Sequence, residues 1–209
     1  MIKKELPHFL IGGSYGGNQD WFRTFMMRIG GCGAETACDS SIYFALHKGL
    51  PQIIPFDSSA LTRESYVDFA HLMEKYLWPR MTGIDRTQIF IDGYAKYLKD
   101  RGVSGLSMTA LDGSVPFEKA AETVRRQIDS GYPIPTLILR HRDKMFDDYT
   151  WHWFLINGYA ADDNDSEISA DHQFMVKAVT YSEYRWLDLR GLWDTGFRRR
   201  GGFVLYHLD

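Results

Sequence analysis

Apolar residues are patterned differently in the first and second parts of the chain. Up to about residue 130 they recur every three or four positions, as on one face of a helix, in four separate windows. Beyond Gly131 they gather in short β-branched and aromatic runs that polar turns separate. Because helices come first and strands follow, the pattern predicts an α+β fold, with N-terminal helices packed on a C-terminal antiparallel sheet.

The first helical window begins at Cys32 and ends at Gly49-Leu50-Pro51. Its apolar stripe contains Ala34, Ala37, Cys38, Ile42, Ala45 and Leu46. The stripe starts with small residues, so another element can pack close to Cys32. Cys38 lies on this stripe, and we expect it to be an inert core thiol. The two cysteines face different directions on the helix, which argues against an intrachain disulfide.

Three more helices are predicted before residue 131. One spans about Glu64 to Leu77. The next starts at Asp85, whose side chain is expected to cap it, and runs toward Asp100. The last occupies about Phe117 to Ser130, with a glycine directly after it as the stop signal.

The strand-like segments are residues 134–142, 151–160, 173–182, 184–189 and 201–208. A short helical turn is expected at 189–193, and the polar stretch 162–171 suits a wide hairpin loop better than a domain boundary. We therefore expect one domain over residues 1–209, with a helical half at about 1–130 and a β half at about 131–209.

Composition narrows the class of protein. The chain has 209 residues, 44% of them hydrophobic and 24% charged, as in ordinary globular domains. A net charge of −3 gives no case for binding nucleic acid or an anionic membrane, and the run Arg198–Arg200 is interpreted as a solvated turn. No window approaches the ~20 apolar residues of a membrane span. Only two cysteines and no signal-like N-terminus favour a cytoplasmic protein with free thiols.

Cys32 is the first candidate for chemistry. In "IGGCGAETACDSSIYFALHKGL" it follows two glycines and opens the helix. Unpaired backbone N–H groups and the positive end of the helix dipole lower a thiol pKa, so a reactive thiolate is expected there. The alternative is a buried structural cysteine, and these residues alone leave both readings open.

A cysteine nucleophile needs a base, normally a histidine. His152 is the strongest candidate because "TWHWFLINGY" places it at the start of a strand, between two tryptophans. A strand histidine bonded to a backbone carbonyl is the plainer interpretation. His141 and His172 lie in similar contexts at strand edges and also remain open.

Three motifs in order resemble a known family. Gln19 in "GGNQDWF", Cys32 in "GGCGAETA" and His152 in "WHWFLINGY" are similar to the papain-like cysteine peptidases, and the bacterial C39-like branch is the nearest match. The segment "GYPIPTLILRHR…WHWFLINGYA" adds to the resemblance, which spans Gly16 to about Trp193. It implies a papain-like fold whose central helix starts at the cysteine.

The resemblance also implies roles for individual residues. Cys32 would attack a carbonyl carbon to form an acyl-enzyme, and His152 would take the thiol proton and pass it to the leaving amine. Gln19 would form the oxyanion hole with the Cys32 backbone N–H, and Asn18 beside it is a rival for that role.

Residues that flank the reactive pair are expected to contact the substrate. Gly31 precedes the cysteine, and Trp151 and Trp153 flank the histidine.

The residue that should orient the histidine is missing from its expected place. Asp188 in "RWLDLRGLW" is the nearest downstream carboxylate, but it also has the position of a helix N-cap. Thr180 is a rival that could accept a hydrogen bond without supplying charge. Asp162 and Asp171 are weaker alternatives, and a two-residue Cys–His site remains possible.

The sequence therefore predicts a cysteine peptidase or amide hydrolase that acts on a peptide or amide through an acyl-enzyme. Two alternatives stay open: acyl transfer, as in the phytochelatin-synthase-like relatives of the fold, and a catalytically inactive peptide-binding module. No cofactor is expected, since the sequence holds neither paired CxxC motifs, nor HExxH, nor a nucleotide-binding glycine loop.

Overall fold

The computed structural model describes residues 2–80, 83–162 and 173–209. In this part of the chain the fold is α+β, with a main sheet of seven antiparallel strands in the order β4-β9-β5-β6-β7-β8 and β1 paired to β6. The strands of this sheet are β1 (Ile2–Glu5), β4 (Leu106–Asp112), β5 (Ile134–Ile138), β6 (His152–Ala161), β7 (Phe174–Thr180), β8 (Glu183–Asp188) and β9 (Gly201–Leu208). The short strands β2 (Leu10–Ile11) and β3 (Ser14–Tyr15) form a separate hairpin.

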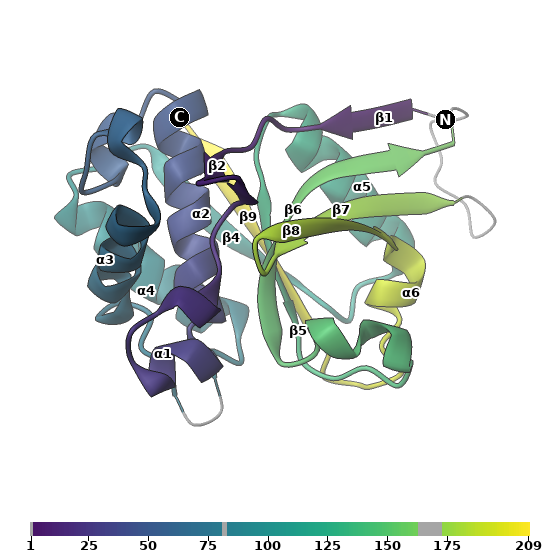
Figure 1. The fold of residues 1–209 in the computed structure, drawn as a ribbon. Coiled ribbons are helices and arrows are strands. Elements are labelled where there is room, and N and C mark those ends of the chain that lie inside the picture. Colours follow the sequence, from purple (N-terminus) through teal and green to yellow (C-terminus); the bar gives the residue numbers. More distant parts are fainter. Residues whose placement is uncertain (1, 81–82, 163–172) are drawn as a thin grey trace.

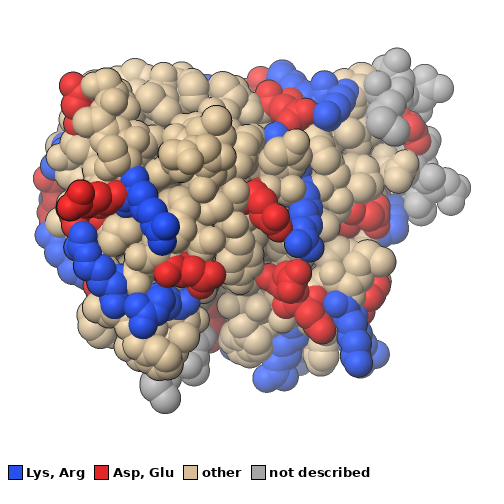
Figure 2. Space-filling view, in the orientation of Figure 1, with Lys and Arg blue, Asp and Glu red and all other residues tan. Residues whose placement is uncertain are grey.

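Helices cover both faces of the sheet. They are α1 (Phe25–Gly30), α2 (Cys32–His47), α3 (Arg63–Glu74), α4 (Thr87–Asp100), α5 (Phe117–Asp129) and α6 (Leu189–Trp193). Figure 1 shows α2, α3 and α4 gathered on one side, with α5 and α6 on the other. None of the helices in the described part of the chain is long and apolar enough to cross a membrane. On the face drawn in Figure 2, acidic and basic side chains are interspersed.

Two hydrophobic cores lie on opposite faces of the sheet. Successive side chains of a strand point to opposite faces, so β9 contributes Val204 and Tyr206 to the core beneath α2, α3 and α4. Phe203 and Leu205 of the same strand enter the core beneath α5 and α6. Strand β9 thus contributes to both layers, and its Tyr206 packs edge-on against Phe44 of α2 at 4.8 Å between ring centroids.

The predicted elements after Cys32 are confirmed in type and nearly in extent. The long helix from Cys32 ends at His47, the turn at Leu189–Trp193 is α6, and the five strand-like segments overlap β5 to β9. Cys38 is fully buried, and both cysteines are free thiols. The predicted loop at 162–171 lies outside the described residues, apart from Asp162.

The predicted division into a helical half and a β half is wrong. Strand β4, at Leu106–Asp112, lies inside the range expected to be helical, yet it forms an edge of the main sheet against β9. Strand β1, at Ile2–Glu5, also joins this sheet. Both pairings bring together segments far apart in the sequence, which a local pattern does not reveal.

The predicted cap at Asp85 is also wrong. Helix α4 begins at Thr87, and its N-cap is Arg86, whose side chain makes no capping hydrogen bond. The Asp85 carboxylate instead accepts a hydrogen bond from the Arg199 guanidinium at 2.6 Å. A charged partner from a distant segment thus holds the side chain that local sequence assigned to the helix.

Candidate active site

Cys32 is the first residue of α2, and a single glycine separates it from α1. A side chain at Gly31 is excluded, because its Cβ would lie 2.3 Å from the Met27 carbonyl oxygen and 3.0 Å from the Phe22 ring. The Gly31 amide donates to the same Met27 carbonyl at 2.9 Å. Gly31 is therefore required for a tight helix–helix junction. The glycines that line the adjacent cavity are Gly30 and Gly83.

Burial dominates the electrostatics of the Cys32 thiol. The residue is only 6% exposed, and burial raises the pKa of its thiol to about 11. Backbone N–H groups of Trp153, Gly33 and Cys32 itself favour the thiolate, but they do not offset the desolvation. The expected lowering of the thiol pKa is therefore wrong: the helix terminus acts in the predicted direction, and loss of water outweighs it.

His152 opens β6 and has both ring nitrogens beside hydroxyl groups. Nε2 lies 2.7 Å from Thr180 Oγ1, and Nδ1 lies 3.5 Å from the Tyr181 hydroxyl. The Tyr181 ring stacks parallel to the imidazole at 4.7 Å between centroids. The histidine is 3% exposed, and burial lowers its pKa to about 4. Its plane and its neutral state are thus both set by the surroundings.

Cys32 and His152 are linked through shared neighbours where α2 packs on β6. Trp153, the residue after the histidine, directs its backbone N–H at the Cys32 sulfur. Tyr181, which stacks on His152, has its pKa raised first by burial and next by the nearby Cys32. Both residues that the sequence singled out therefore have Trp153 and Tyr181 as neighbours.

Tyr181 was not indicated by the sequence. It occupies the tip of the β7–β8 hairpin, where both turn residues have positive φ, 53° at Tyr181 and 63° at Ser182. Two-residue hairpin turns of this kind prefer Asn-Gly, so the pair Tyr-Ser carries no recognisable turn signal. Side chains held in strained backbone conformations gather at functional sites, and here the strain places a phenol over the histidine.

Gln19 lies in the short helical turn η1 (Gln19–Trp21), next to the first turn of α2. Its side-chain Nε2 donates to the Arg28 carbonyl at 2.9 Å. A primary amide has a second N–H, which remains to be donated to a ligand. The neighbouring Asn18 accepts from the Asp20 amide at 2.8 Å and caps η1, so its amide oxygen is engaged as a cap while its Nδ2 keeps two N–H donors.

Two buried carboxylates on α2 hold the loop that carries Gln19. Glu35 accepts the Gln19 backbone N–H at 2.9 Å. One turn further, Asp39 accepts the Gly17 N–H at 3.2 Å and the Tyr66 hydroxyl at 2.7 Å. Burial raises the pKa of both, to about 7 for Asp39. Their only sequence signal is an acidic pair at i, i+4 spacing beside a stripe of apolar residues.

The same loop is tied to the β7–β8 hairpin. Ser182 donates its amide to the Gly17 carbonyl at 2.9 Å, and Tyr15 donates its amide to the Ser182 carbonyl at 3.0 Å. Burial and Asp39 raise the pKa of Glu35, while the Tyr181 backbone N–H favours its ionised form. Helix α2, the loop of Gln19 and the hairpin of Tyr181 are thus linked directly by hydrogen bonds.

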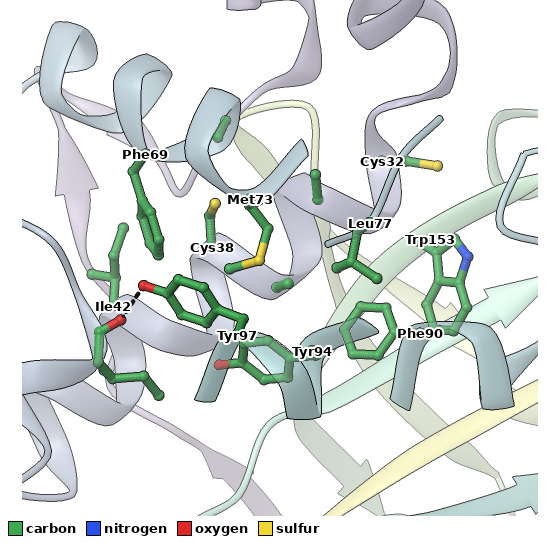
Figure 3. Close-up of a cluster of buried hydrophobic side chains, with 14 of the residues drawn as sticks. Cys32, Cys38, Ile42, Phe69, Met73, Leu77, Phe90, Tyr94, Tyr97 and Trp153 are labelled. Carbon is green, nitrogen blue, oxygen red and sulfur yellow. Dashed lines mark hydrogen bonds between the residues drawn. The ribbon is translucent and has the colours of Figure 1, made fainter. Parts of the chain in front are cut away.

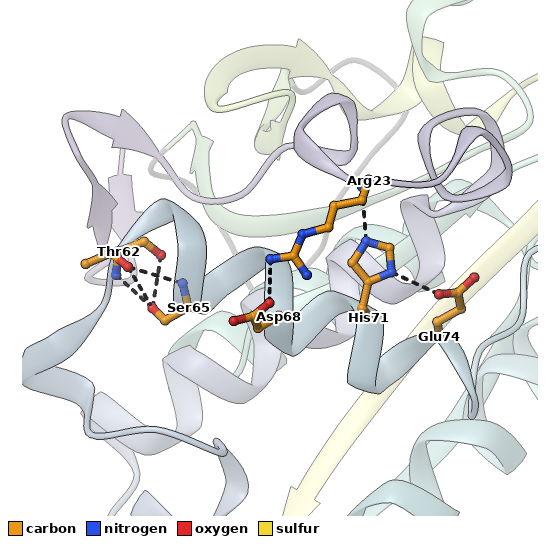
Figure 4. Close-up of polar contacts among 6 residues, drawn as sticks. All are labelled: Arg23, Thr62, Ser65, Asp68, His71 and Glu74. Atoms are coloured by element: carbon orange, nitrogen blue, oxygen red, sulfur yellow. Dashed lines mark hydrogen bonds and ion pairs between the residues drawn. The ribbon is translucent and has the colours of Figure 1, made fainter.

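Helix α3 supports this assembly from outside. Arg23, just after η1, donates its amide to His71 Nε2 at 3.0 Å, and its guanidinium pairs with Asp68 (Figure 4). His71 Nδ1 in turn lies 3.0 Å from Glu74. A capping box between Thr62 and Ser65 starts the helix. These contacts fix the segment between Gln19 and Cys32.

Asp188 does not orient the histidine. It accepts the Gly191 amide at 2.6 Å as the N-cap of α6, at the opposite end of β8 from the Tyr181 turn. Asp162 is exposed and follows the far end of β6, and Asp171 lies outside the described residues. Thr180 holds the place beside His152, because β7 runs antiparallel to β6 and ends next to the imidazole.

The two tryptophans around His152 have different surroundings. Trp153 is buried, stacks on Phe90 at 4.6 Å and donates its indole N–H to the Ile84 carbonyl at 2.6 Å. Figure 3 shows Cys32 on the same side of the cluster as Trp153, whereas Cys38 points among core side chains. Trp151 is 49% exposed and has a positive φ of 50°.

A cavity of about 520 Å³ opens beside the Cys32 sulfur. Its walls are mostly apolar and include Met26, Ile29, Ile84, Leu137, Leu139, Trp151 and Trp153. This volume lies within the range of small-molecule sites. The cavity can hold an apolar group of a ligand next to the Cys32 thiol.

No family model matches the chain, and no curated protein matches its sequence. In the part of the chain that the structure describes, no three His, Cys, Asp or Glu side chains are grouped so that they could hold a metal ion.

Proposed function

We propose that this chain is a papain-like cysteine peptidase or amide hydrolase that forms an acyl-enzyme on Cys32. The observation that carries the proposal is that Cys32, the first residue of α2, lines a cavity and shares Tyr181 as a neighbour with His152. The order of motifs around Gln19, Cys32 and His152 supports the same family. The two free thiols fit a reducing compartment such as the cytoplasm.

In the empty site, the neutral thiol and neutral imidazole are the favoured forms. The pKa values of about 11 for Cys32 and about 4 for His152 place the separated ion pair about 10 kcal/mol above the neutral pair, before mutual attraction. His152 therefore acts as a general base during attack, rather than maintaining a thiolate beforehand.

The reaction then proceeds in two halves. His152 accepts the thiol proton as Cys32 Sγ bonds to the substrate carbonyl carbon, and the carbonyl oxygen becomes an oxyanion. The second N–H of the Gln19 amide and the Cys32 backbone N–H donate to that oxygen. The C–N bond breaks, His152 gives its proton to the leaving amine, and water hydrolyses the remaining thioester.

Thr180 holds the histidine in place through the 2.7 Å contact with Nε2. With Nε2–H donating to the threonine hydroxyl, Nδ1 is the basic nitrogen. Tyr181 covers one face of the ring and limits access of water. The pair of hydroxyl-bearing residues supplies orientation without a charge, in contrast to an aspartate that would stabilise the imidazolium.

The cavity at Cys32 determines which kind of chemical group the substrate carries beside the scissile bond. Aliphatic and aromatic walls favour a large apolar side chain or acyl group. Arg80 is the charged residue among these walls. We therefore include an apolar group next to the attacked carbonyl in the proposed substrate.

The test uses fluorogenic peptide amides with phenylalanine or leucine beside the scissile bond. Wild type is expected to release the fluorophore and to show a mass increase on Cys32 equal to the acyl group in quenched samples. Cys32→Ala abolishes both signals, while the matched variant Cys38→Ala retains them. If wild type forms no acyl-enzyme with any such substrate, the hydrolase proposal is wrong and a binding module becomes the better interpretation.

Acyl transfer is the second candidate, because the deep burial of Cys32 restricts water around the thioester. Adding amine or thiol acceptors to the assay separates the two activities. A hydrolase keeps the free acid as its main product at millimolar acceptor, whereas a transferase converts most of the acyl-enzyme to the acceptor adduct.

A further inference from the structure

A second cavity, of about 310 Å³, adjoins the one at Cys32. It is lined by Leu139, Arg140, Trp151, Phe197, Arg198 and Arg199. Leu139 and Trp151 also line the first cavity, so the two spaces share a wall. Trp151, half-exposed and with positive φ, stands between an apolar space on one side and a cationic space on the other.

The second cavity carries an excess of positive charge. Arg199 is paired with Asp85 at 2.6 Å. Arg140 places its guanidinium 5.7 Å from the centre of the Trp151 ring. Within the described residues, neither Arg140 nor Arg198 has a carboxylate partner within ion-pair distance. Three guanidinium groups and one carboxylate leave a local charge of about +2 on a chain whose net charge is −3.

The tertiary fold brings these arginines together from separate segments. Arg140 follows β5, and Arg198 and Arg199 precede β9. The Leu139 amide donates to the Arg200 carbonyl at 2.9 Å, and the Trp151 amide donates to the Leu139 carbonyl at 3.1 Å. Backbone hydrogen bonds therefore hold both segments at the edge of the cavity. The interpretation of Arg198–Arg200 as a merely solvated turn does not account for this placement.

We propose that the ligand of this protein carries a carboxylate next to the apolar group that enters the Cys32 cavity, and that Arg140 and Arg198 bind this carboxylate. Guanidinium groups suit carboxylates because they donate two parallel hydrogen bonds. The carboxylate belongs either to an acidic side chain or to the C-terminus of a peptide. The proposal rests on the proposed function for the position of the attacked bond, but binding of the carboxylate is independent of catalysis.

The test measures binding to Cys32→Ala, which holds peptides without reacting. The probes are capped tetrapeptides that contain Phe-Glu or Phe-Gln, and a matching pair that ends in Phe with a free carboxylate or an amide. Titration calorimetry is expected to show about tenfold tighter binding of the acid in one pair. The pair that shows the preference identifies the source of the carboxylate.

Arg140→Gln and Arg198→Gln, each made in the Cys32→Ala background, are expected to remove most of that preference and leave the uncharged peptides unchanged. Arg63→Gln is the matched control, because Arg63 also lies over a tryptophan ring, Trp21, at 4.8 Å. Equal affinity for acid and amide in both pairs, or no binding of any acidic peptide at millimolar concentration, overturns the proposal. An acid preference without acyl-enzyme formation in wild type contradicts only the proposed hydrolase, and hydrolysis without acid preference contradicts only the carboxylate site.

Discussion

Asp39 is expected to make the stability of this protein depend on pH. Its carboxyl group is buried against Tyr66 and Gly17, and burial raises its pKa from 3.8 to about 7. Well below pH 3.8 the group is protonated in both the folded and the unfolded chain. Between pH 4 and pH 7 only the unfolded chain ionises it, so the free energy of unfolding falls as pH rises.

The loss amounts to about 4 kcal/mol, because the pKa rises from 3.8 to about 7 and each pH unit is equivalent to about 1.4 kcal/mol. Asp39→Asn removes the ionisation. The difference in unfolding free energy, variant minus wild type, is therefore expected to increase by about 4 kcal/mol from pH 4 to pH 7.5. The absolute offset depends on how the amide replaces the bonds to Gly17 and Tyr66.

Urea unfolding followed by tryptophan fluorescence at half-unit pH steps measures this difference. Asp92→Asn, at an exposed position on α4, is the matched control and is expected to keep the wild-type slope. A difference between Asp39→Asn and wild type that stays constant over the range would refute the reasoning, because it would mean that Asp39 titrates alike in the folded and unfolded chains.

Three further outcomes are expected. Thr180→Val should lower kcat by about a hundredfold with little change in KM, because His152 loses its orientation. Thr180→Ser should restore most of the rate, and equal rates for the two variants would contradict the role of the hydroxyl. The rate of Cys32 labelling by iodoacetamide, followed by mass spectrometry, should be low at pH 7 and rise about tenfold per pH unit toward the thiol pKa of about 11. A rate that is already maximal at pH 6 would indicate a preformed thiolate. Gly17→Ala should lower the free energy of unfolding by about 1–3 kcal/mol, because a Cβ there would lie 1.8 Å from the Tyr66 hydroxyl oxygen; unchanged stability in urea would contradict this packing.

Much of the fold could be predicted from local patterns. Helical periodicity and glycine signals located α2, with Cys32 as its first residue, and β-branched runs located β5 to β9. Strand β4 was missed because much of "LSMTALD" is exposed and it pairs with β9, about a hundred residues further along the chain. Edge strands that depend on such distant partners carry little local signal.

The candidate reactive residues were named from the sequence, whereas the residues that position them were left open or missed. Residue type and position were enough to single out Cys32 and His152 as candidates, whereas Gln19 was indicated by the family resemblance. Deciding whether Asp188 or Thr180 contacts His152 required the register of β7 beside β6. Asp188, eight positions after Thr180, caps α6 and does not reach the imidazole. Tyr181 needed the hairpin geometry that turns its ring over the imidazole.

The sequence by itself determined which residues could react and that the cysteine opens a helix, because helix boundaries and residue chemistry are local properties. Only the tertiary structure decided their ionisation and their surroundings. Desolvation depends on everything packed around a group, so burial raised the thiol pKa that the helix terminus alone would lower. The arginines around Trp151 form one cationic cavity for the same reason: chain segments distant in sequence converge there in space.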